Sequence, residues 1–320
     1  MINKIQIKTW AKLGHRGTLG TSLLELASNL ENLMVLTADL STTSGLTRFE
    51  QTYPDKFLNM GIAEQNMVGV AAGLAKEGYI TFTTTFATFA TMRSCEQIRN
   101  YLGYMEFNVK IVGMASGFSM GMFGNTHYAI EDIALMRSIP NITIISPSDC
   151  FEVNKSIFAV ALLKGPVYLR LSGTMNTPII YQDDYEFEVG RSIILRGGDD
   201  VVIIACGTMV SVSLSAAKIL ESVGISAAVI NMHTIKPIDK QAIASACESS
   251  RLLVTVEEHN IIGGLGSAVA EYKSTLKNTP PQLFIGIPDT FCKPGDYQYL
   301  LNHFGLTPES IAQKIQEHIH

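Results

Sequence analysis

Apolar and polar residues follow one another along this chain in blocks of the length that strands and helices need. Residues 18–29 carry leucines at helical spacing, and the apolar run 32–40 that follows predicts a short buried strand ending near a polar Asp. A helix rich in Ala and Gly is expected at 62–76. Strands alternating with helices of this length indicate a mostly parallel sheet with helices on both faces. Further strands are expected at 79–90 (at its start), 108–116, 141–149 and 165–172.

Residues 174–190 interrupt this pattern, because they carry Pro, Asp and Asn and show no helical period. A second, smaller α/β series follows. We therefore predict two doubly wound domains, the first at 1–175 and the second at 191–320, joined by a linker at 176–190. Within the second domain the pattern predicts strands at 200–207, 225–232, 251–260 and 282–288, and helices at 211–224, 238–250 and 263–276.

The composition narrows the class of protein. A chain of 320 residues with 47% hydrophobic and 17% charged residues fits about two well-packed domains. Its net charge of −5 argues against a nucleic-acid or anionic-membrane partner. None of the five cysteines forms a CxxC pair, the N-terminus is too polar for a signal peptide, and no apolar run approaches the roughly 20 residues of a membrane helix. We expect a soluble cytoplasmic protein.

One carboxylate stands out from the pattern. Glu64 lies in NMGIAEQNMVGVAAGLA, just ahead of a small-residue, apolar run. A buried carboxylate is costly unless something pairs with it, and a shielded one is suited to exchanging a proton with a bound base. A Glu that simply favours the helix N-terminus is the ordinary alternative, and the residues alone leave both open.

Other candidates also have ordinary explanations. Phe86, Phe89 and Met92 are spaced three apart, which suits a core stripe or an aromatic face for a flat heterocycle. A lone His such as His127 is more often a capping or satisfied polar residue, but Gly121 and Gly124 before it suggest a loop that could place it in a cleft. The glycine-rich turns GTLG (17–20) and GGLG (263–266) could face a phosphate, but tight turns explain most such glycines. No cluster of His, Cys, Asp and Glu has metal-ligand spacing, so no metal site is predicted on this chain.

Three segments together carry a resemblance to a known family. GIAEQNMVGVAAGLA, TTFATFATMRSCEQIR and EDIALMRSIPNITIISPSD resemble transketolase, with support from LTADLS and GNTHYAIED. The chain looks like the C-terminal subunit of a split transketolase, with a pyrimidine-binding domain and a transketolase C-terminal domain. The resemblance extends from Arg16 to the last helix. In the second domain it rests mainly on the pattern of strands and helices, with few specific motifs.

The resemblance implies roles for individual residues. Glu64 matches the family Glu that hydrogen-bonds the aminopyrimidine ring of thiamine diphosphate and promotes activation of the cofactor. Phe89 matches the aromatic ring on which the pyrimidine stacks, with Phe86 and Met92 beside it. Asp39 resembles an Asp that supports this pocket. His127 matches a His that contacts the oxygen atoms of the substrate.

The resemblance also implies a partner chain. The family's GDG…Asn motif, which holds a divalent metal, is absent here. The diphosphate-binding domain and its Mg²⁺ are therefore expected on an N-terminal transketolase subunit, with thiamine diphosphate shared across the interface. The chain alone is expected to be inactive, and an assembly of two copies of each chain (α2β2) is expected.

Some positions depart from the family pattern. Met122 and Phe123 stand where common transketolases have two acids, and a phosphate-binding His is missing near Ala115. Gly173 stands about where the family often has an Arg. The remaining candidates for holding a distal anion of the substrate are Arg16 and Arg170, and Phe123 and His127 are candidates for facing the sugar.

We interpret the chain as part of an enzyme that moves a two-carbon ketol unit from a ketose to an aldehyde. The altered loop suggests an unusual sugar, without a terminal phosphate or with a modified carbon, although another residue could supply the phosphate contact. Two alternatives stay open. One is a decarboxylating relative, such as a deoxyxylulose-phosphate synthase or a 2-oxoacid dehydrogenase β subunit. The other is a non-catalytic subunit of such a complex.

Overall fold

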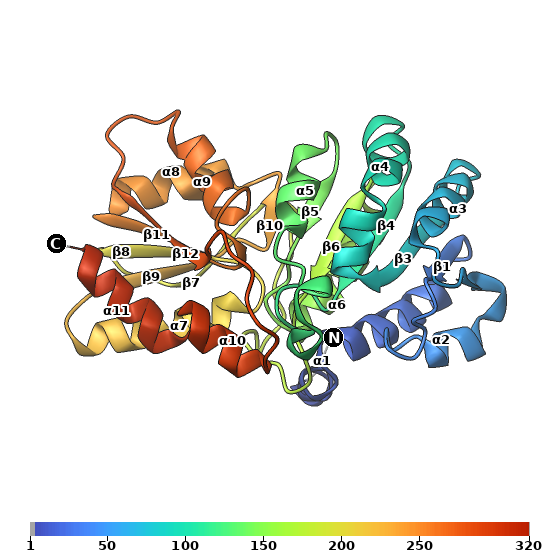
Figure 1. The fold of residues 1–320 in the computed structure, drawn as a ribbon, viewed down its shortest axis with the longest axis horizontal. Helices are drawn as coiled ribbons and strands as arrows, with labels where there is room; N and C mark the ends of the chain where they lie inside the picture. The colour runs from blue at the N-terminus through green and yellow to red at the C-terminus, as the bar shows by residue number, and fades with distance from the viewer. Residues whose placement is uncertain (1–3, 320) are drawn as a thin grey trace.

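The computed structural model describes residues 4–319 and contains two α/β parts that lie side by side (Figure 1). One part is built on a seven-stranded sheet and the other on a five-stranded sheet. Most neighbouring strands in both sheets run parallel. The predicted class, two α/β domains with mostly parallel sheets, is therefore confirmed.

The larger sheet holds the strands predicted in the first half of the chain. Its strands are shorter than the apolar runs, because the runs continue into buried loops. A three-residue strand, β2, was not predicted. In spatial order the strands are β10 (Thr234–Lys236), β5 (Thr143–Ile145), β6 (Val167–Leu171), β4 (Val109–Met114), β3 (Ile80–Phe86), β1 (Leu33–Thr37) and β2 (Phe57–Asn59).

Strand β10 comes from the second half of the chain but belongs to the larger sheet. It pairs antiparallel with β5, with Thr234 opposite Ile145. The sequence did not predict this exchange, because three residues are too few for a periodic signal. The limits 1–175 and 191–320 stay a prediction, but the two parts share a sheet edge beyond the expected linker.

The smaller sheet contains the four strands of the second predicted series and a fifth strand, β7, that was not predicted. Strand β7 at its edge runs antiparallel to β9, and the other pairs are parallel. In spatial order the strands are β12 (Gln282–Ile287), β11 (Leu252–Asn260), β8 (Val201–Ala205), β9 (Ala227–Asn231) and β7 (Ile193–Arg196).

Helices cover both faces of each sheet (Figure 1). One apolar core is continuous across the two parts, because it combines buried side chains of α3 (Glu64–Lys76) and α5 (Asp132–Ser138) with those of α8 (Lys240–Ser249) and α9 (Leu265–Lys273). The opposite faces pack against α1 (Lys4–Asn29), α2 (Thr47–Thr52) and α6 (Cys150–Leu162) in the first part, and against α7 (Met209–Ser222), α10 (Tyr297–Phe304) and α11 (Pro308–His318) in the second.

The first helix is longer than predicted and is kinked at Gly14, whose φ is 74°. A Cβ at this glycine would lie 2.4 Å from the backbone oxygen of Thr174, so the kink brings α1 against the residues just before the expected linker. The GTLG turn lies inside α1. A Cβ at Gly20 would lie 1.9 Å from the oxygen of Gly45, so close packing explains that glycine.

Short helical turns connect the strands of the first part. The segment after β3 forms the π-helix η2 (Phe89–Arg93), then α4 (Cys95–Gln97) and a second π-helix, η3 (Ile98–Tyr104). Two 3₁₀ turns occur elsewhere, η1 (Pro54–Lys56) before β2 and η4 (Gly121–Thr126) after β4. Such π-turns are frequent at functional sites, and η2 carries part of the candidate site.

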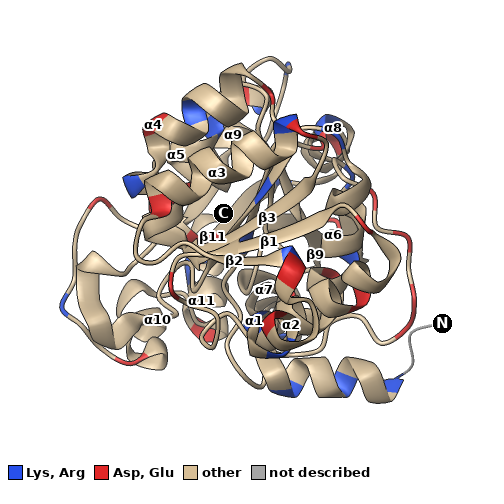
Figure 2. Cartoon of the chain, turned by 90° about the vertical axis from the view of Figure 1, so that its right-hand side faces the viewer, with Lys and Arg blue, Asp and Glu red and all other residues tan. Residues whose placement is uncertain are grey.

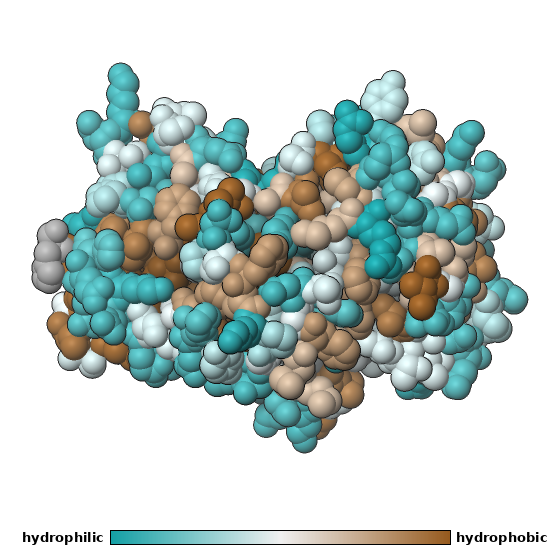
Figure 3. All heavy atoms as spheres, in the orientation of Figure 1, coloured by the Kyte–Doolittle hydropathy of each residue, from teal (hydrophilic) through white to brown (hydrophobic). Residues whose placement is uncertain are grey.

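The surface is mixed in character. Figure 2, a view toward β1, β2 and β3, shows Lys, Arg, Asp and Glu interspersed over the helices and loops, with the strands largely free of charge. Figure 3 shows exposed hydrophobic residues in several separate places on the face drawn, between hydrophilic ones. Of the helices formed by residues 4–319, none is long and apolar enough to cross a membrane.

Candidate functional site

The candidate residues gather at the carboxyl edge of the larger sheet. Strand β3 ends at Phe86, which lies opposite Met114 at the end of β4, and Met114 in turn lies opposite Leu171 at the end of β6. In open parallel sheets, the loops after these strand ends form the usual place for a ligand site. The loops here lead into η2, η4 and residues 172–175.

Glu64 is the first residue of α3, and its side chain is only 3% exposed. Arg93, the last residue of η2, donates from Nη1 to both carboxylate oxygens of Glu64 at 2.8 Å. The Arg93 side chain is itself 44% exposed. Glu64 therefore stands at a helix N-terminus and is also buried with a partner, and its exchange of a proton with a bound base stays a prediction.

Aromatic side chains lie next to this ion pair. The Arg93 guanidinium carbon lies 4.4 Å from the ring centre of Phe89. The rings of Phe86 and Phe89 are 6.1 Å apart, and the His127 ring contacts Phe89 edge-on at 5.3 Å. Phe123 lies 5.0 Å from His127 on the side toward solvent and is 61% exposed. The structure therefore brings Glu64, the aromatic residues and His127 into one cluster.

Met92 lies on the same turn as Phe89 and Arg93. Its sulfur is 3.8 Å from the hydroxyl of Thr88, and its side chain is 47% exposed. Phe86 and Phe89 are half-buried. These residues are therefore partly exposed, unlike a closed core stripe, and the Arg93 guanidinium lies over the Phe89 ring.

Asp39 belongs to a neighbouring loop that is tied to the segment before α3. The Asn59 side-chain oxygen accepts hydrogen bonds from the backbone N–H groups of Asp39, at 3.1 Å, and of Gly61, at 3.0 Å. Asn59 Nδ2 donates to Asp39 Oδ1 at 3.3 Å. Asp39 is exposed and has a positive φ of 57°, a conformation that Asp adopts more readily than most residues. No hydrogen bond or ion pair joins Asp39 to Glu64.

The loop that carries His127 is braced by the second part of the chain. Gly295 N donates to the Gly121 oxygen at 3.2 Å, and Asn125 Nδ2 donates to the Cys292 oxygen at 2.9 Å. A Cβ at Gly121 would lie 2.4 Å from the Gly295 oxygen, so glycine permits this approach. The position of His127 therefore depends on contacts between the two domains.

Three positions that depart from the family pattern, Ala115, Met122 and Gly173, differ in their exposure and in how closely neighbouring atoms pack against them. Met122 is 71% exposed, so its side chain is free to face a ligand or a partner. Ala115 is buried directly after β4 and has a φ of 52°. A Cβ at Gly173 would lie 2.4 Å from the His15 ring, and the Gly173 N–H donates to His15 Nδ1 at 3.0 Å. His15 thus fills the space that an arginine side chain would need.

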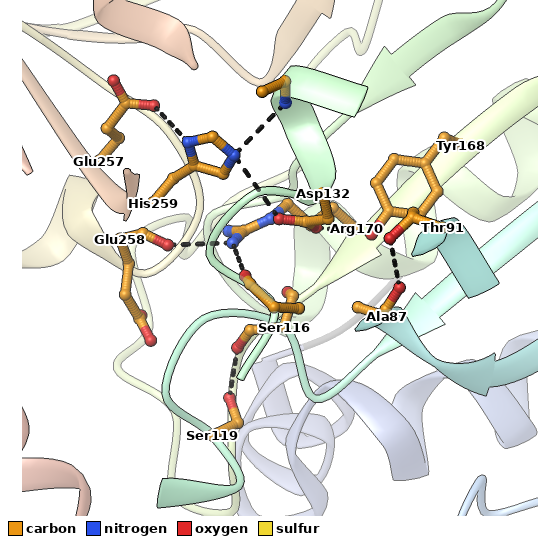
Figure 4. A network of polar contacts seen from close by, with 12 residues as sticks. Ala87, Thr91, Ser116, Ser119, Asp132, Tyr168, Arg170, Glu257, Glu258 and His259 are labelled. Atoms are coloured by element: carbon orange, nitrogen blue, oxygen red, sulfur yellow. Dashed lines mark hydrogen bonds and ion pairs between the residues drawn. The ribbon is translucent and has the colours of Figure 1, made fainter. Parts of the chain in front are cut away.

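Of the two arginines proposed for an anion, only one is accessible. Arg16 is partly exposed on α1, and within residues 4–319 its side chain makes no ion pair. Arg170 is 1% exposed and donates to Asp132 at 2.8 Å and to the backbone oxygens of Ala129 and Glu258 at 3.1 and 2.9 Å (Figure 4). A substrate could reach the Arg170 guanidinium only if these bonds broke.

Arg170 belongs to a buried polar network between the two domains. Tyr168 donates to Asp132 at 2.6 Å, and His259 Nε2 lies 3.9 Å from the other oxygen of Asp132 (Figure 4). Burial lowers the pKa of His259 to about 4, so this ring is neutral near pH 7. The network joins the ends of β6 and β11 to the start of α5.

Residues 257–260 (EEHN), at the end of β11, contribute carboxylates to the same region. Glu257 accepts hydrogen bonds from the backbone N–H groups of Leu265 and Gly266, at 2.6 and 2.8 Å, at the start of α9. Burial raises the pKa of Glu257 to about 7. The GGLG turn therefore binds a carboxylate of the chain itself, which explains its glycines without a phosphate. Glu258 accepts from the backbone N–H of Phe118 at 2.6 Å and holds the loop after β4.

Arg93 was not singled out from the sequence. A signal was present, because Arg93 lies four residues after Phe89 on the segment expected to line the pocket. Its pairing with Glu64 spans 29 residues, which local patterns do not predict.

Within residues 4–319, no group of three or more His, Cys, Asp or Glu side chains is placed to hold a metal ion.

Two family models match the chain. The transketolase pyrimidine-binding domain matches residues 11–176, and the transketolase C-terminal domain matches residues 190–311. Together they cover both sheets and all of the candidate site.

Curated relatives match over nearly their whole length. A putative transketolase C-terminal section from Methanocaldococcus jannaschii is 45% identical over 95% of this chain and 96% of its own. A 6-deoxy-6-sulfo-D-fructose transketolase subunit from Clostridium sp. (strain MSTE9) is 39% identical over 94% of this chain and 93% of its own. One subunit of an apulose-4-phosphate transketolase from Phocaeicola vulgatus is 37% identical over 95% of this chain and 97% of its own.

A solved structure is similar over the same extent. A split-gene transketolase, described as an inactive β4 tetramer, has a TM-score of 0.87 and is 40% identical, with 96% of this chain and 98% of that chain covered.

Proposed function

The chain belongs to the transketolase family, and on that premise we propose that it is the pyrimidine-domain subunit of a two-chain, thiamine diphosphate-dependent transketolase. The enzyme would move a two-carbon ketol unit from a ketose to an aldehyde. The observation that carries this proposal is the placement of Glu64, a buried carboxylate that shares its partner Arg93 with the face of Phe89. Full-length likeness to subunits of split transketolases supports it.

The residues present fit an aminopyrimidine ring. Glu64 offers a shielded carboxylate that can hold or exchange a proton at a ring nitrogen. Phe86, Phe89 and Met92 offer a partly exposed apolar face on which a flat ring can stack. Asp39 would support the loop beside α3 through Asn59. When bound, thiamine diphosphate supplies the nucleophilic carbon for two-carbon transfer.

His127 would face the reacting sugar from the other side of Phe89. Its Nδ1 lies 2.9 Å from the Thr126 hydroxyl, and its ring is held between Phe89 and Phe123. These contacts orient the imidazole, so that Nε2 can form a hydrogen bond with a substrate oxygen. The bracing of this loop by residues 292–295 would give the second domain a part in positioning the substrate.

A partner chain would complete the site. The diphosphate of the cofactor and its Mg²⁺ would be held by an N-terminal transketolase subunit that carries the diphosphate-binding domain, in an α2β2 assembly. The exposed apolar side chains at the site support this, because Met92, Met122 and Phe123 are open in the single chain. The related β4 tetramer is described as inactive, as expected of such a subunit without its partner. A cytoplasmic location, which free thiols at all five cysteines suit, belongs to the same proposal.

The substrate would be an unusual sugar. Two relatives of similar identity act, by their names, on different sugars, a sulfo-deoxyfructose and apulose 4-phosphate. The apolar side chains of Met122 and Phe123 would desolvate the sugar end near His127, and Gly173 leaves no room for an anion-binding side chain. Arg16 is the accessible candidate for a distal anion.

The direct test combines this chain with its partner subunit, thiamine diphosphate and Mg²⁺, and offers xylulose 5-phosphate as donor. Release of glyceraldehyde 3-phosphate, dependent on both chains, would support two-carbon transfer from an ordinary sugar. Turnover of a deoxy, sulfonated or unphosphorylated ketose with higher kcat/KM would support the unusual substrate. Release of carbon dioxide from a 2-oxo acid, with no transfer from any ketose, would replace the proposal with a decarboxylating enzyme.

A further inference from the structure

Arg93 contacts both groups that the proposed function assigns to the pyrimidine ring. Its Nη1 donates to both oxygens of Glu64 at 2.8 Å, and its guanidinium carbon lies 4.4 Å from the centre of the Phe89 ring. One side chain therefore fills the space between the carboxylate and the aromatic face. A pyrimidine ring that bonded Glu64 and stacked on Phe89 would need the same space.

The guanidinium has the chemical features that this space selects. It is planar, carries N–H donors suited to a carboxylate and stacks on aromatic faces. An aminopyrimidine is also planar, has an N–H donor in its amino group and can carry a proton on a ring nitrogen that faces a carboxylate. We propose that Arg93 occupies the pyrimidine position in the cofactor-free chain and must leave Glu64 before the cofactor ring binds. This inference rests on the proposed function and adds a regulatory step to the same site.

The burial of Glu64 explains why a substitute cation is useful there. A carboxylate that is 3% exposed is strongly destabilising without a partner, because it has lost most of its hydration. Arg93 supplies the opposite charge while the cofactor is absent. The pair would therefore keep the free subunit folded until the cofactor and the partner chain arrive.

The two side chains differ in their freedom to move. Glu64 is enclosed at the start of α3, whereas Arg93 is 44% exposed and has an open route to solvent. The backbone of Arg93 is held, because its carbonyl oxygen accepts a hydrogen bond from Gln65 Nε2 at 3.1 Å. The exchange would therefore be a movement of the Arg93 side chain, with the π-helix η2 kept in place.

Competition between Arg93 and the cofactor gives a measurable consequence. Every binding event must first break the Arg93–Glu64 pair, so the pair lowers the apparent affinity for the cofactor. A partly exposed ion pair is typically worth about 1 kcal/mol, which corresponds to about a fivefold change in Kd. Removing the arginine should therefore tighten cofactor binding, whereas removing an ordinary binding residue would weaken it.

The experiment compares Arg93→Met with Arg99→Met in the complete chain. Arg99 is an exposed arginine of the next helical turn that bonds Asn100 at 3.0 Å, so it is a matched control away from Glu64. Equilibrium binding of thiamine diphosphate to the complex with the partner subunit and Mg²⁺ is measured by calorimetry. We expect R93M to bind about fivefold more tightly than the wild type, and R99M to be unchanged. Unchanged or weaker binding by R93M would overturn the proposal.

A second measurement needs no cofactor. In the free chain, R93M should lower the Tm because Glu64 loses its partner, and this loss should be much smaller in a Glu64→Gln background. An equal loss in both backgrounds would show that Arg93 does not act through Glu64 and would also overturn the proposal. Should R93M not fold, Arg93→Gln provides the same two comparisons.

These results separate the inference from the proposed function. If E64Q retains full activity in the complex, the proposed role of Glu64 fails, whatever R93M does. If E64Q is inactive and R93M weakens cofactor binding, the proposed function stands and only the competition by Arg93 is refuted.

Discussion

Replacing Arg170 with Met would remove a buried cation from the boundary between the two domains and leave an apolar side chain of similar reach. Three hydrogen bonds would be lost, one to Asp132 and two to the backbone oxygens of Ala129 and Glu258. Asp132 is 1% exposed and would keep the hydroxyl of Tyr168, at 2.6 Å, as a donor. The change therefore leaves a buried carboxylate without its cation.

The expected cost follows from these contacts. Removing one partner of a buried ion pair typically costs about 3–5 kcal/mol, because the remaining charge is uncompensated. The two backbone oxygens that lose their donor increase this free-energy cost, whereas the tyrosine hydroxyl that still donates to Asp132 decreases it. We expect R170M to lower the free energy of unfolding by about 4 kcal/mol, a large share of the roughly 5–15 kcal/mol of an ordinary protein.

The assay is urea unfolding of the free chain at pH 7, followed by far-ultraviolet circular dichroism. The double variant R170M/D132N, which removes the stranded charge, should recover part of the loss. A loss below about 1 kcal/mol in R170M would refute the structural role of Arg170. In the reconstituted enzyme, if R170M lost activity on phosphorylated donors but not on unphosphorylated ones, Arg170 would instead be assigned to substrate binding.

Three further predictions follow from single contacts. The pKa of Glu257 is raised to about 7 in the folded chain, so the folded state binds this proton more tightly than the unfolded state. The stability that the bound proton contributes is full below about pH 4.5 and is lost as the pH rises toward 7. In urea titrations, the free energy of unfolding of E257Q relative to the wild type should therefore rise by roughly 2–4 kcal/mol over this range. Gly173→Ala should lower stability by about 1–3 kcal/mol without improving the KM for phosphorylated sugars, because its Cβ would lie 2.4 Å from the His15 ring; a better KM would refute this. Phe123→Asp, beside His127, should shift kcat/KM toward donors with a hydroxyl at the contacted carbon by roughly tenfold, as expected for one charged hydrogen bond, and an unchanged ratio would remove Phe123 from the substrate site.

Local pattern was enough to predict most of the sheet strands. Runs such as 108–116 and 165–172 are apolar enough to be buried on both faces, and they became β4 and β6. The helix expected at 211–224 begins two residues earlier, at Met209, and ends before Gly224, whose φ is 81°. Glycine adopts this conformation without steric cost, so a glycine after an apolar helical pattern allows the end of the helix to be predicted from the sequence.

Contacts between distant segments were not readable in the same way. Strand β10 is three residues long, and what places it is its pairing with β5, almost 90 residues earlier in the chain. Arg170 was expected at a substrate anion because it lies near Gly173, where the family often has an Arg, but it pairs with Asp132 on a different element. Spacing reveals which residues share a face of one element, and it does not reveal which charges meet across elements.

The candidate site was partly readable because its parts lie at strand and helix ends. Glu64, Phe86, Phe89 and His127 were singled out from the sequence, and the structure places the rings and the carboxylate in one cluster. Their roles toward cofactor and sugar stay predictions. The Arg93 contact was missed because its place four residues after Phe89 indicates a residue near the pocket but does not show that it pairs with Glu64, 29 residues earlier.

The most direct test of the central claim is the rate of two-carbon transfer by the complex of both chains with Glu64→Gln. Glutamine keeps the size of the side chain and can still contact Arg93, but it cannot take up a proton from a ring nitrogen. The proposed role predicts a fall in kcat of at least about 100-fold, the usual contribution of a positioned acid–base group, with the complex still assembled. A rate within about twofold of the wild type would contradict the assignment of Glu64 and, with it, the catalytic role of this chain.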